Sequence, residues 1–176
     1  PEERSMTDLH PILSAAEKDF DQSLERLFAL CRIPSISTDP AHAADCDRAA
    51  AAIVADLSSM GFDAKARPTP GRPMVVAHYT PKDANAKTPH VLFYGHYDVQ
   101  PADPLELWKS PPFAPQRRKD ADGVERLYGR GTADDKGQFM TFVEAARAWI
   151  TATGSSERRP LAVSCSAIRG RLPTPM

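Results

Sequence analysis

The stretch that decides the fold lies within residues 91–137, which begin VLFYGHYDVQP and, after a Trp- and Pro-rich insert, end LYGRGTADDKG. The apolar run 91–94 stops at Gly95, which is typical of a short buried strand. His96 and Asp98 follow where this strand ends, the edge at which open α/β sheets bind ligands. Both side chains point to the same side of an extended chain. A carboxylate beside a histidine holds the proton of one ring nitrogen and turns the other nitrogen toward a metal.

The second half of the stretch carries two adjacent carboxylates, Asp134 and Asp135, on a glycine-rich turn that leads into a predicted helix. A carboxylate can bridge two cations and offset part of their charge. Each motif alone has a simpler interpretation, because His-x-Asp is commonly a surface pair and Asp-Asp before a helix is commonly an N-cap. Their joint occurrence, one after a buried strand and one before a helix, favours a metal site.

The motifs GHYDVQP and LYGRGTADDKGQ resemble the zinc aminoacylase and carboxypeptidase superfamily (acetylornithine deacetylase/succinyl-diaminopimelate desuccinylase-like), specifically its dipeptidase-like branch. The segment WKSPPFAP at 108–115 resembles the same branch, as do IPSIS at 33–37 and the Gly61-Phe62 pair. The similarity covers roughly residues 14–165. It implies an α/β fold, the N-terminal part of a zinc-exopeptidase-like catalytic domain, with a mostly parallel sheet flanked by helices.

The resemblance also implies roles for individual residues. His96 would bind one zinc, Asp134 would bridge two zinc ions, and Asp98 would act as a catalytic residue that orients His96. Asp135 matches no ligand position and is expected to shape the backbone, with a cis peptide bond between Asp134 and Asp135. The implied cofactor is zinc, two ions in the complete site, with cobalt or manganese as alternatives, and the implied reaction is hydrolysis of the amide bond of a dipeptide or N-acyl amino acid.

The chain departs from this family after the helix that follows Asp135. In the family, the next strand leads to a Glu-Glu pair that supplies the general base and another zinc ligand, and a further carboxylate and a distant histidine complete the site. No acidic residue follows Glu157 in this sequence. We therefore expect an N-terminal fragment that is inactive by itself and binds zinc weakly. The tail 166–176 is atypical, and a shifted reading frame is one hypothesis for it.

Apolar periodicity and turn residues predict the layout of the chain. Residues 1–13 are expected to be a disordered extension, and residues 14–165 the first part of a di-zinc peptidase catalytic domain. Ser14 with Glu17 is the predicted capping box of the first helix. The last strand is expected to form an exposed apolar edge. Helices are predicted near 14–32, 43–60 and 138–153, and strands near 62–67, 73–79, 89–95 and 159–165.

Composition limits the partners that we expect. The formal net charge is −1 and the pI is near 6.6, which does not favour nucleic acid or an acidic membrane surface as a partner. The cysteines Cys31, Cys46 and Cys165 are odd in number and unpatterned, which favours buried thiols in a reducing cytoplasm. The expected substrate is a small peptide or acyl-amino acid, and the full-length family protein is expected to allow a homodimer.

Two other functional classes stay open from the sequence. The chain is then either a non-catalytic α/β fragment that keeps His96 and Asp134 as relics, or a metal-dependent hydrolase of another class, since His-x-Asp with a later Asp occurs in other two-metal enzymes. A phosphate loop at GRGTADDKG is disfavoured, because the Walker spacing is missing and the two carboxylates would repel phosphate.

Overall fold

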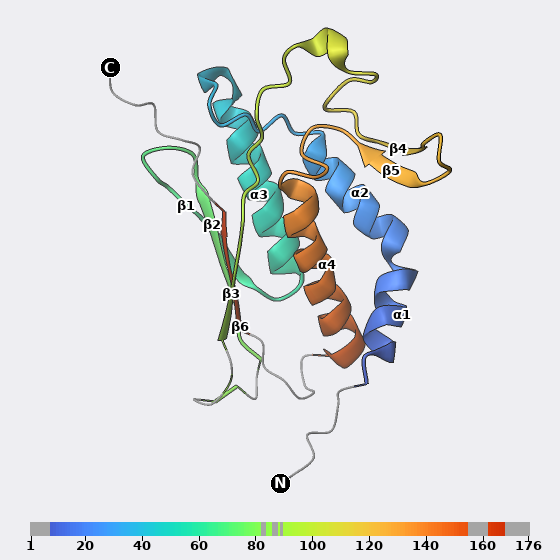
Figure 1. Cartoon of the computed structure of the whole chain (residues 1–176). Helices are drawn as coiled ribbons and strands as arrows, with labels where there is room; N and C mark the ends of the chain where they lie inside the picture. Colours follow the sequence, from blue (N-terminus) through green and yellow to red (C-terminus); the bar gives the residue numbers. More distant parts are fainter. Residues whose placement is uncertain (1–7, 82–83, 86–87, 89, 155–161, 168–176) are drawn as a thin grey trace.

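The computed structural model describes residues 8–81, 84–85, 88, 90–154 and 162–167. In this part of the chain, helices lie to one side of a four-stranded sheet, and a two-stranded hairpin lies near one end (Figure 1). The helices are α1 (His10–Lys18), α2 (Phe20–Cys31), α3 (Ala43–Ser59) and α4 (Lys136–Thr153), with 3-10 turns η1 (Pro40–His42) and η2 (Leu105–Leu107). The strands are β1 (Asp63–Arg67), β2 (Met74–Tyr79), β3 (His90–Gly95), β4 (Gln116–Lys119), β5 (Glu125–Tyr128) and β6 (Ala162–Ala167).

The main sheet has the strand order β1-β2-β6-β3. β3 and β6 are parallel and are joined by the crossover helix α4, as the alternation of strand and helix predicted. The α/β class is thus confirmed. The mostly parallel character is not confirmed within the described residues, because β1 with β2 and β2 with β6 are antiparallel pairs.

The position of the last strand differs from the sequence-based expectation. β6 pairs with β2 on one side and with β3 on the other, so the predicted exposed edge at this strand is wrong. The edge position falls to β3, where Leu92 and Tyr94 are exposed. β6 extends to Ala167, so the first two residues of the predicted tail belong to the sheet. Residues 159–161 and 168–176 of the predicted strand and tail lie outside the described residues.

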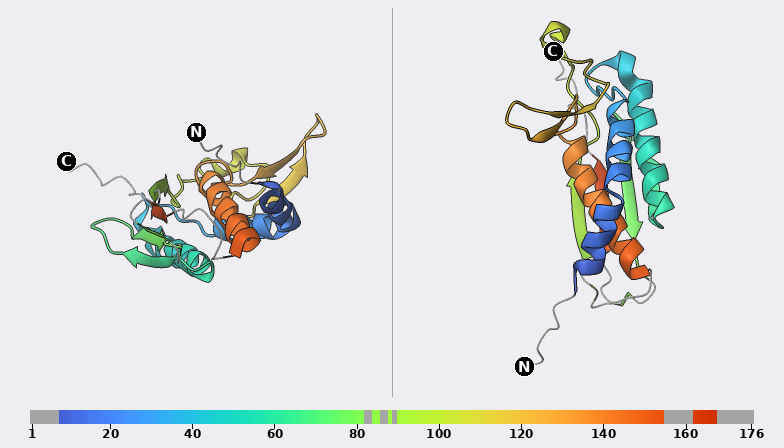
Figure 2. Two further views of the ribbon diagram at one scale, coloured as in Figure 1. Left: turned by 90° about the horizontal axis from the view of Figure 1, so that it is seen from below. Right: turned by 90° about the vertical axis from the view of Figure 1, so that its right-hand side faces the viewer.

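The helices form two layers on the sheet. α3 packs on β1 and β2, α4 packs on β3, and α1 and α2 pack against the outer side of α4 (Figure 2). The rings of Phe93 in β3 and Phe142 in α4 stack at a centroid distance of 3.9 Å. The apolar faces predicted for α3 and α4 do face the core, whose buried members include Leu27, Phe28, Ile53, Leu57, Val75, Tyr97, Phe139 and Val143.

The first helix begins earlier than its sequence pattern predicted. α1 starts at His10 with Leu9 in the N-cap position, so Ser14 lies inside the helix and the predicted capping box is wrong. Pro11 stands in the first turn, where its fixed φ and missing N–H suit a helix start. The expected disorder of residues 1–13 is therefore wrong for residues 10–13, and residues 1–7 lie outside the described part.

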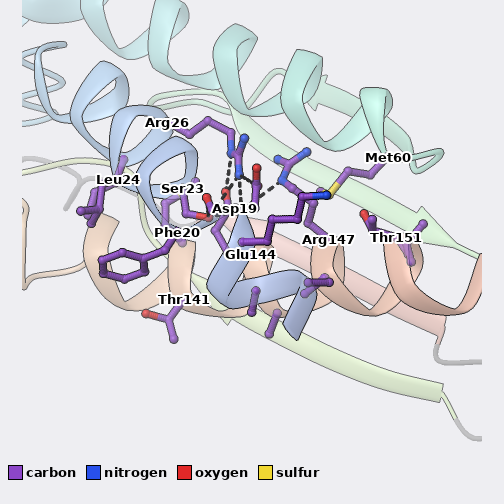
Figure 3. Close-up of a pocket in the computed structure, with 18 of the residues that line it drawn as sticks. Asp19, Phe20, Ser23, Leu24, Arg26, Met60, Thr141, Glu144, Arg147 and Thr151 are labelled. Carbon is purple, nitrogen blue, oxygen red and sulfur yellow. Dashed lines mark hydrogen bonds and ion pairs between the residues drawn. The ribbon is translucent and has the colours of Figure 1, made fainter. Parts of the chain in front are cut away.

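The predicted helix 14–32 is divided into α1 and α2 at Asp19. The Asp19 side chain is part of a network of charged residues. Arg26 in α2 pairs with the Asp19 carboxylate and, at 2.7 Å, with Glu144 of α4. Arg147 bonds the same Glu144 at 3.0 Å and Asp56 of α3 at 2.6 Å. Figure 3 shows four of these side chains, Asp19, Arg26, Glu144 and Arg147, gathered where α2 faces α4. The network holds the outer helices to the helices that cover the sheet.

The hairpin of β4 and β5 was not predicted. Its strands are joined by an Asp122-Gly123 turn, a strong hairpin signal, and Gly123 has a φ of +78°. Arg118 lies over the Tyr128 ring at 4.0 Å. The insert between the two motifs is thus partly regular structure.

Two simpler expectations can be checked against the described residues. Cys31 and Cys46 are both free and buried, as expected for thiols in a core; the side chain of Cys165 lies outside the described residues. No helix in the described part of the chain has the length and apolar character needed to cross a bilayer.

Candidate metal centre

The structure brings together the three residues that the sequence singled out, from two separate segments. His96 and Asp98 follow the carboxyl end of β3, and Asp134 precedes α4. The His96 Nε2 atom lies 3.1 Å from Asp134 Oδ1. The other ring nitrogen, Nδ1, lies 3.2 Å from Asp98 Oδ1 and 3.1 Å from the Asp98 carbonyl oxygen. The imidazole is thus placed between two carboxylates, with Nε2 on the side of Asp134.

Exposure differs sharply among these side chains. The Asp134 side chain is 80% exposed and that of His96 33% exposed, whereas Asp98 is only 16% exposed. Asp134 and Nε2 therefore face an accessible side of the molecule. Asp98 supports the imidazole from behind, in surroundings where water competes less for its oxygens.

Glycines allow the close approach between β3 and the turn that carries Asp134. A Cβ atom on Gly95 would lie 2.7 Å from the Phe139 Cβ and 3.1 Å from Asp135 Oδ2. A Cβ atom on Gly137 would lie only 1.9 Å from the Thr132 carbonyl oxygen. These positions explain why the chain places glycine at the end of the strand and in the first turn of the helix.

Asp135 ties the helix start to the strand end. Its Oδ2 accepts a hydrogen bond from the His96 backbone N–H at 2.9 Å, and its carbonyl oxygen accepts one from Phe139 N–H at 2.9 Å. The Asp134–Asp135 peptide bond is cis, as the resemblance implied. Asp135 occupies the N-cap position of α4, as the simpler interpretation of the Asp-Asp pair has it, but its side chain makes no capping hydrogen bond. The expected backbone-shaping role agrees with these contacts.

Ser37 contributes a contact that sequence reasoning did not single out. Its hydroxyl donates to Asp98 Oδ2 at 2.5 Å, the oxygen that does not face His96. The loop that carries Ser37 runs beside residues 97–99, with a parallel bridge between Ile36 and Val99. The signal that could have found it was the IPSIS segment, which the resemblance included without assigning it a task.

Lys136 is a second residue that the sequence did not single out. It directly follows Asp135, is fully buried, and donates from Nζ to the carbonyl oxygens of Leu30 at 3.0 Å and Ile33 at 2.8 Å. Burial lowers the pKa of Lys136 from its ordinary 10.5 to about 8. The lysine therefore links the end of α2 to the turn that carries Asp134.

The donor set fits a divalent metal of the zinc type, although only in part. Imidazole nitrogen and carboxylate oxygen are both zinc ligands, and two ligand atoms at tetrahedral positions around one zinc lie roughly 3.3 Å apart. The 3.1 Å between His96 Nε2 and Asp134 Oδ1 is close to this separation. Within the described ranges, no group of three or more His, Cys, Asp or Glu side chains could hold a metal ion. The arrangement provides two converging ligands.

A groove elsewhere on the molecule is a poor alternative site. It has a volume of about 1300 Å³, lies along α1, α2 and α4, and its lining does not include His96, Asp98 or Asp134. Its charged side chains, Arg26, Glu144 and Arg147 among them, already pair with one another. Because these charges already compensate one another, they would gain little by binding a charged ligand. We therefore interpret the groove as a feature of the packing of the helices.

Comparison with known proteins places this geometry in a family. The sequence pattern of peptidase family M20/M25/M40 matches residues 92–165, which contain His96, Asp98 and Asp134. Residues 92–165 are thus similar to this peptidase family. The M20 segment thus covers the strand end, the insert and the helix start that build the candidate site.

Individual relatives extend the similarity beyond the M20 segment. The chain is 33% identical over 152 residues to the Cys-Gly metallodipeptidase DUG1 of Candida albicans, covering 80% of this chain and 30% of the relative. It is 49% identical over 70 residues to a succinyl-diaminopimelate desuccinylase of Acidovorax ebreus, covering 40% and 17%. The solved structure of the di-peptidase Dug1p from Saccharomyces cerevisiae superposes with a TM-score of 0.72 at 27% identity, covering 91% of this chain and 34% of that one.

The chain covers only a small part of the length of each relative. The chain spans 30% of the Candida protein, 17% of the Acidovorax protein and 34% of the Saccharomyces structure. The similarity therefore relates residues 92–165 to the M20 family and supports the fold around them. The names of the relatives, a metallodipeptidase, a di-peptidase and a desuccinylase, describe those proteins.

Proposed function

We propose that this chain carries one half of the metal centre of a metal-dependent hydrolase that cleaves the amide bonds of dipeptides or N-acyl amino acids. The observation that carries the proposal is the 3.1 Å approach of His96 Nε2 to Asp134 Oδ1, with Nδ1 held by Asp98. The substrate class follows from relatives whose names describe a Cys-Gly metallodipeptidase and a succinyl-diaminopimelate desuccinylase.

The proposed roles follow from the contacts. His96 would hold the metal through Nε2, because Nδ1 faces the Asp98 carboxylate and the Asp98 carbonyl oxygen. Asp134, the most exposed of the three, would supply a carboxylate ligand beside it, shared with a second ion. Asp98 keeps the His96 ring oriented and raises its basicity. When bound, a zinc pair lowers the pKa of a shared water and polarises the substrate carbonyl.

We further propose that these 176 residues do not catalyse hydrolysis alone. In the described residues, neither His96, Asp98 nor Asp134 is free to act as the general base, since each has a role in holding or orienting the metal. General base catalysis is typically worth about 10²–10⁴-fold in rate.

The metal is proposed to be zinc, with cobalt or manganese as alternatives. We also propose a cytoplasmic location, and a homodimer for the full-length protein.

Calorimetric titration of the chain with zinc tests the metal role. Wild-type protein should bind weakly, because zinc sites normally use three or four protein ligands. His96→Ala and Asp134→Ala should each abolish the binding, and Asp98→Ala should weaken it by about 10–100-fold. His42→Ala is the matched control, since His42 pairs with Asp45 at the start of α3 rather than with a residue of the site, and it should bind like the wild type. Binding that survives His96→Ala would overturn the assignment.

The hydrolytic role needs a separate assay. The 176-residue chain with zinc should cleave neither Cys-Gly nor N-succinyl-diaminopimelate above background. A longer chain that restores the remaining length of the relatives should cleave one of them, and His96→Ala or Asp134→Ala should remove that activity. Turnover by the 176-residue chain comparable to a full-length relative would contradict the proposal.

A further inference from the structure

We propose that Ser37 is a positioning residue of the metal centre, whose hydroxyl fixes the Asp98 carboxylate so that His96 presents Nε2 to the metal. The proposal rests on the metal role proposed above for His96. It adds a residue from a different part of the chain, some sixty positions before the site. Ser37 touches neither the metal nor a substrate, so it acts only through Asp98.

The two oxygens of Asp98 have different partners. Oδ2 accepts the hydrogen bond from Ser37 Oγ, and Oδ1 lies 3.2 Å from His96 Nδ1. The hydrogen bond of Nδ1 goes to the Asp98 carbonyl oxygen at 3.1 Å, and the carboxylate oxygen Oδ1 lies beside it. A carboxylate that is hydrogen-bonded at one oxygen and in contact with the imidazole at the other cannot turn about its Cβ–Cγ bond without losing one of these contacts. The Ser37 hydroxyl therefore helps to set the plane in which Asp98 meets the imidazole, and so the direction in which Nε2 points.

The loop that carries Ser37 is itself held in place. Ser35 Oγ donates to the Tyr97 carbonyl oxygen at 2.7 Å, and Val99 N–H donates to the Ser35 carbonyl oxygen at 3.0 Å. The Arg72 Nε–H donates to the Ser37 carbonyl oxygen at 3.2 Å. A hydroxyl on a backbone fixed at several points can orient its partner, whereas a hydroxyl on a free loop would follow it.

The low exposure of Asp98 increases the energetic importance of its hydrogen bond to Ser37. Asp98 is 16% exposed, so water replaces a lost hydroxyl poorly, and hydrogen bonds to charged groups are stronger than those between neutral groups. Removal of the Ser37 hydroxyl should leave Asp98 in place but less well oriented. We expect Ser37→Ala to weaken zinc binding by about 3–10-fold, less than the 10–100-fold expected for removal of Asp98 itself.

The first test requires no metal. Nitrogen-15 NMR of the metal-free 176-residue chain reports which ring nitrogen of His96 carries the proton at a pH where the ring is neutral. Wild-type protein should show the proton on Nδ1, and Ser37→Ala should shift the signals toward a mixture of tautomers. Ser37→Thr, which keeps the hydroxyl, should restore the wild-type signals. Ser59→Ala is the matched control, because it removes a serine hydroxyl hydrogen bond, that to the Asp56 carbonyl oxygen at the end of α3, and leaves the loop that carries Ser37 intact.

The second test is a zinc titration of a double-mutant cycle. If Ser37 acts through Asp98, Ser37→Ala should weaken binding in the wild type but have no further effect in Asp98→Ala protein. The two tests separate the failures: a wild-type chain that binds no zinc overturns the proposed function, while the metal-free NMR still decides on Ser37. His96 signals that are the same in Ser37→Ala and Ser59→Ala protein, or an equal loss of affinity in both backgrounds, would overturn the positioning role.

Discussion

Gly137→Ala tests the close packing that places Asp134 beside the end of β3. Gly137 lies in the first turn of α4, and an added Cβ atom would lie 1.9 Å from the Thr132 carbonyl oxygen. That oxygen must retreat by roughly 1.5 Å to reach ordinary van der Waals contact. The movement also disturbs the 3.1 Å hydrogen bond from Gly137 N–H to the Gly131 carbonyl oxygen. The turn that the contact displaces is the one that carries Asp134.

The sign of the effect is what makes this substitution informative. In a helix without such a contact, Gly→Ala stabilises by up to about 1 kcal/mol. Here overpacking costs about 1–3 kcal/mol and the weakened hydrogen bond about 0.5–1.5 kcal/mol. We expect a net loss of about 2 kcal/mol in the free energy of unfolding, and so a urea midpoint lower by about 1 M when followed by circular dichroism.

A glycine in open surroundings provides the matched control. A Cβ atom on Gly71 would meet nothing closer than Thr69 Oγ1 at 3.8 Å, so Gly71→Ala should change stability by less than about 1 kcal/mol. If Gly137→Ala protein is as stable as the wild type, or more stable, the packing of α4 on the Thr132 turn is not as described. The position of Asp134 relative to His96 would then lose its support.

Two further predictions concern stability. Burial raises the pKa of the Cys31 and Cys46 thiols from 9.0 to about 11, so the folded chain keeps protons that the unfolded chain releases; this stabilisation is fully present below pH 9 and is lost as the pH rises to about 11. Replacing both cysteines with alanine should flatten the fall of the urea midpoint between about pH 9 and pH 11, and an unchanged fall would contradict it. Glu144→Gln should lower the free energy of unfolding by about 1–3 kcal/mol, because Glu144 is partly buried between Arg26 and another arginine. Asp122→Asn, which breaks an exposed ion pair, should leave the free energy of unfolding nearly unchanged, and equal losses for both would refute the view that the partly buried network holds α2 to α4.

Local patterns were sufficient for the central part of the fold. The apolar run that ends at Gly95 and the helical spacing of Phe139 and Val143 predicted β3 and α4 to within a residue or two. Both signals depend on neighbours in sequence and on burial of one face, which periodicity reports directly. Since His96 and Asp134 adjoin these two elements, their approach could be anticipated as well.

Features that depend on partners distant in sequence could not be predicted in this way. The division of the first helix at Asp19 coincides with pairing to Arg26, which also binds Glu144 of α4. The central place of β6 depends on antiparallel pairing with β2, and nothing in the apolar residues of β6 distinguishes a central from an edge strand. Ser37 and its hydrogen bond to Asp98 likewise join two segments that no local pattern relates.

The measurement that tests the central claim most directly is a zinc titration of the 176-residue chain followed by NMR at the side chains of His96 and Asp134. The geometry predicts that the signals of His96 Nε2 and the Asp134 carboxylate shift together, reversibly and at the same zinc concentration, while those of His42 stay unchanged. Shifts at His42 with His96 and Asp134 unaffected, or a tight two-zinc site that persists after His96→Ala, would contradict the claim that these two residues form the metal centre.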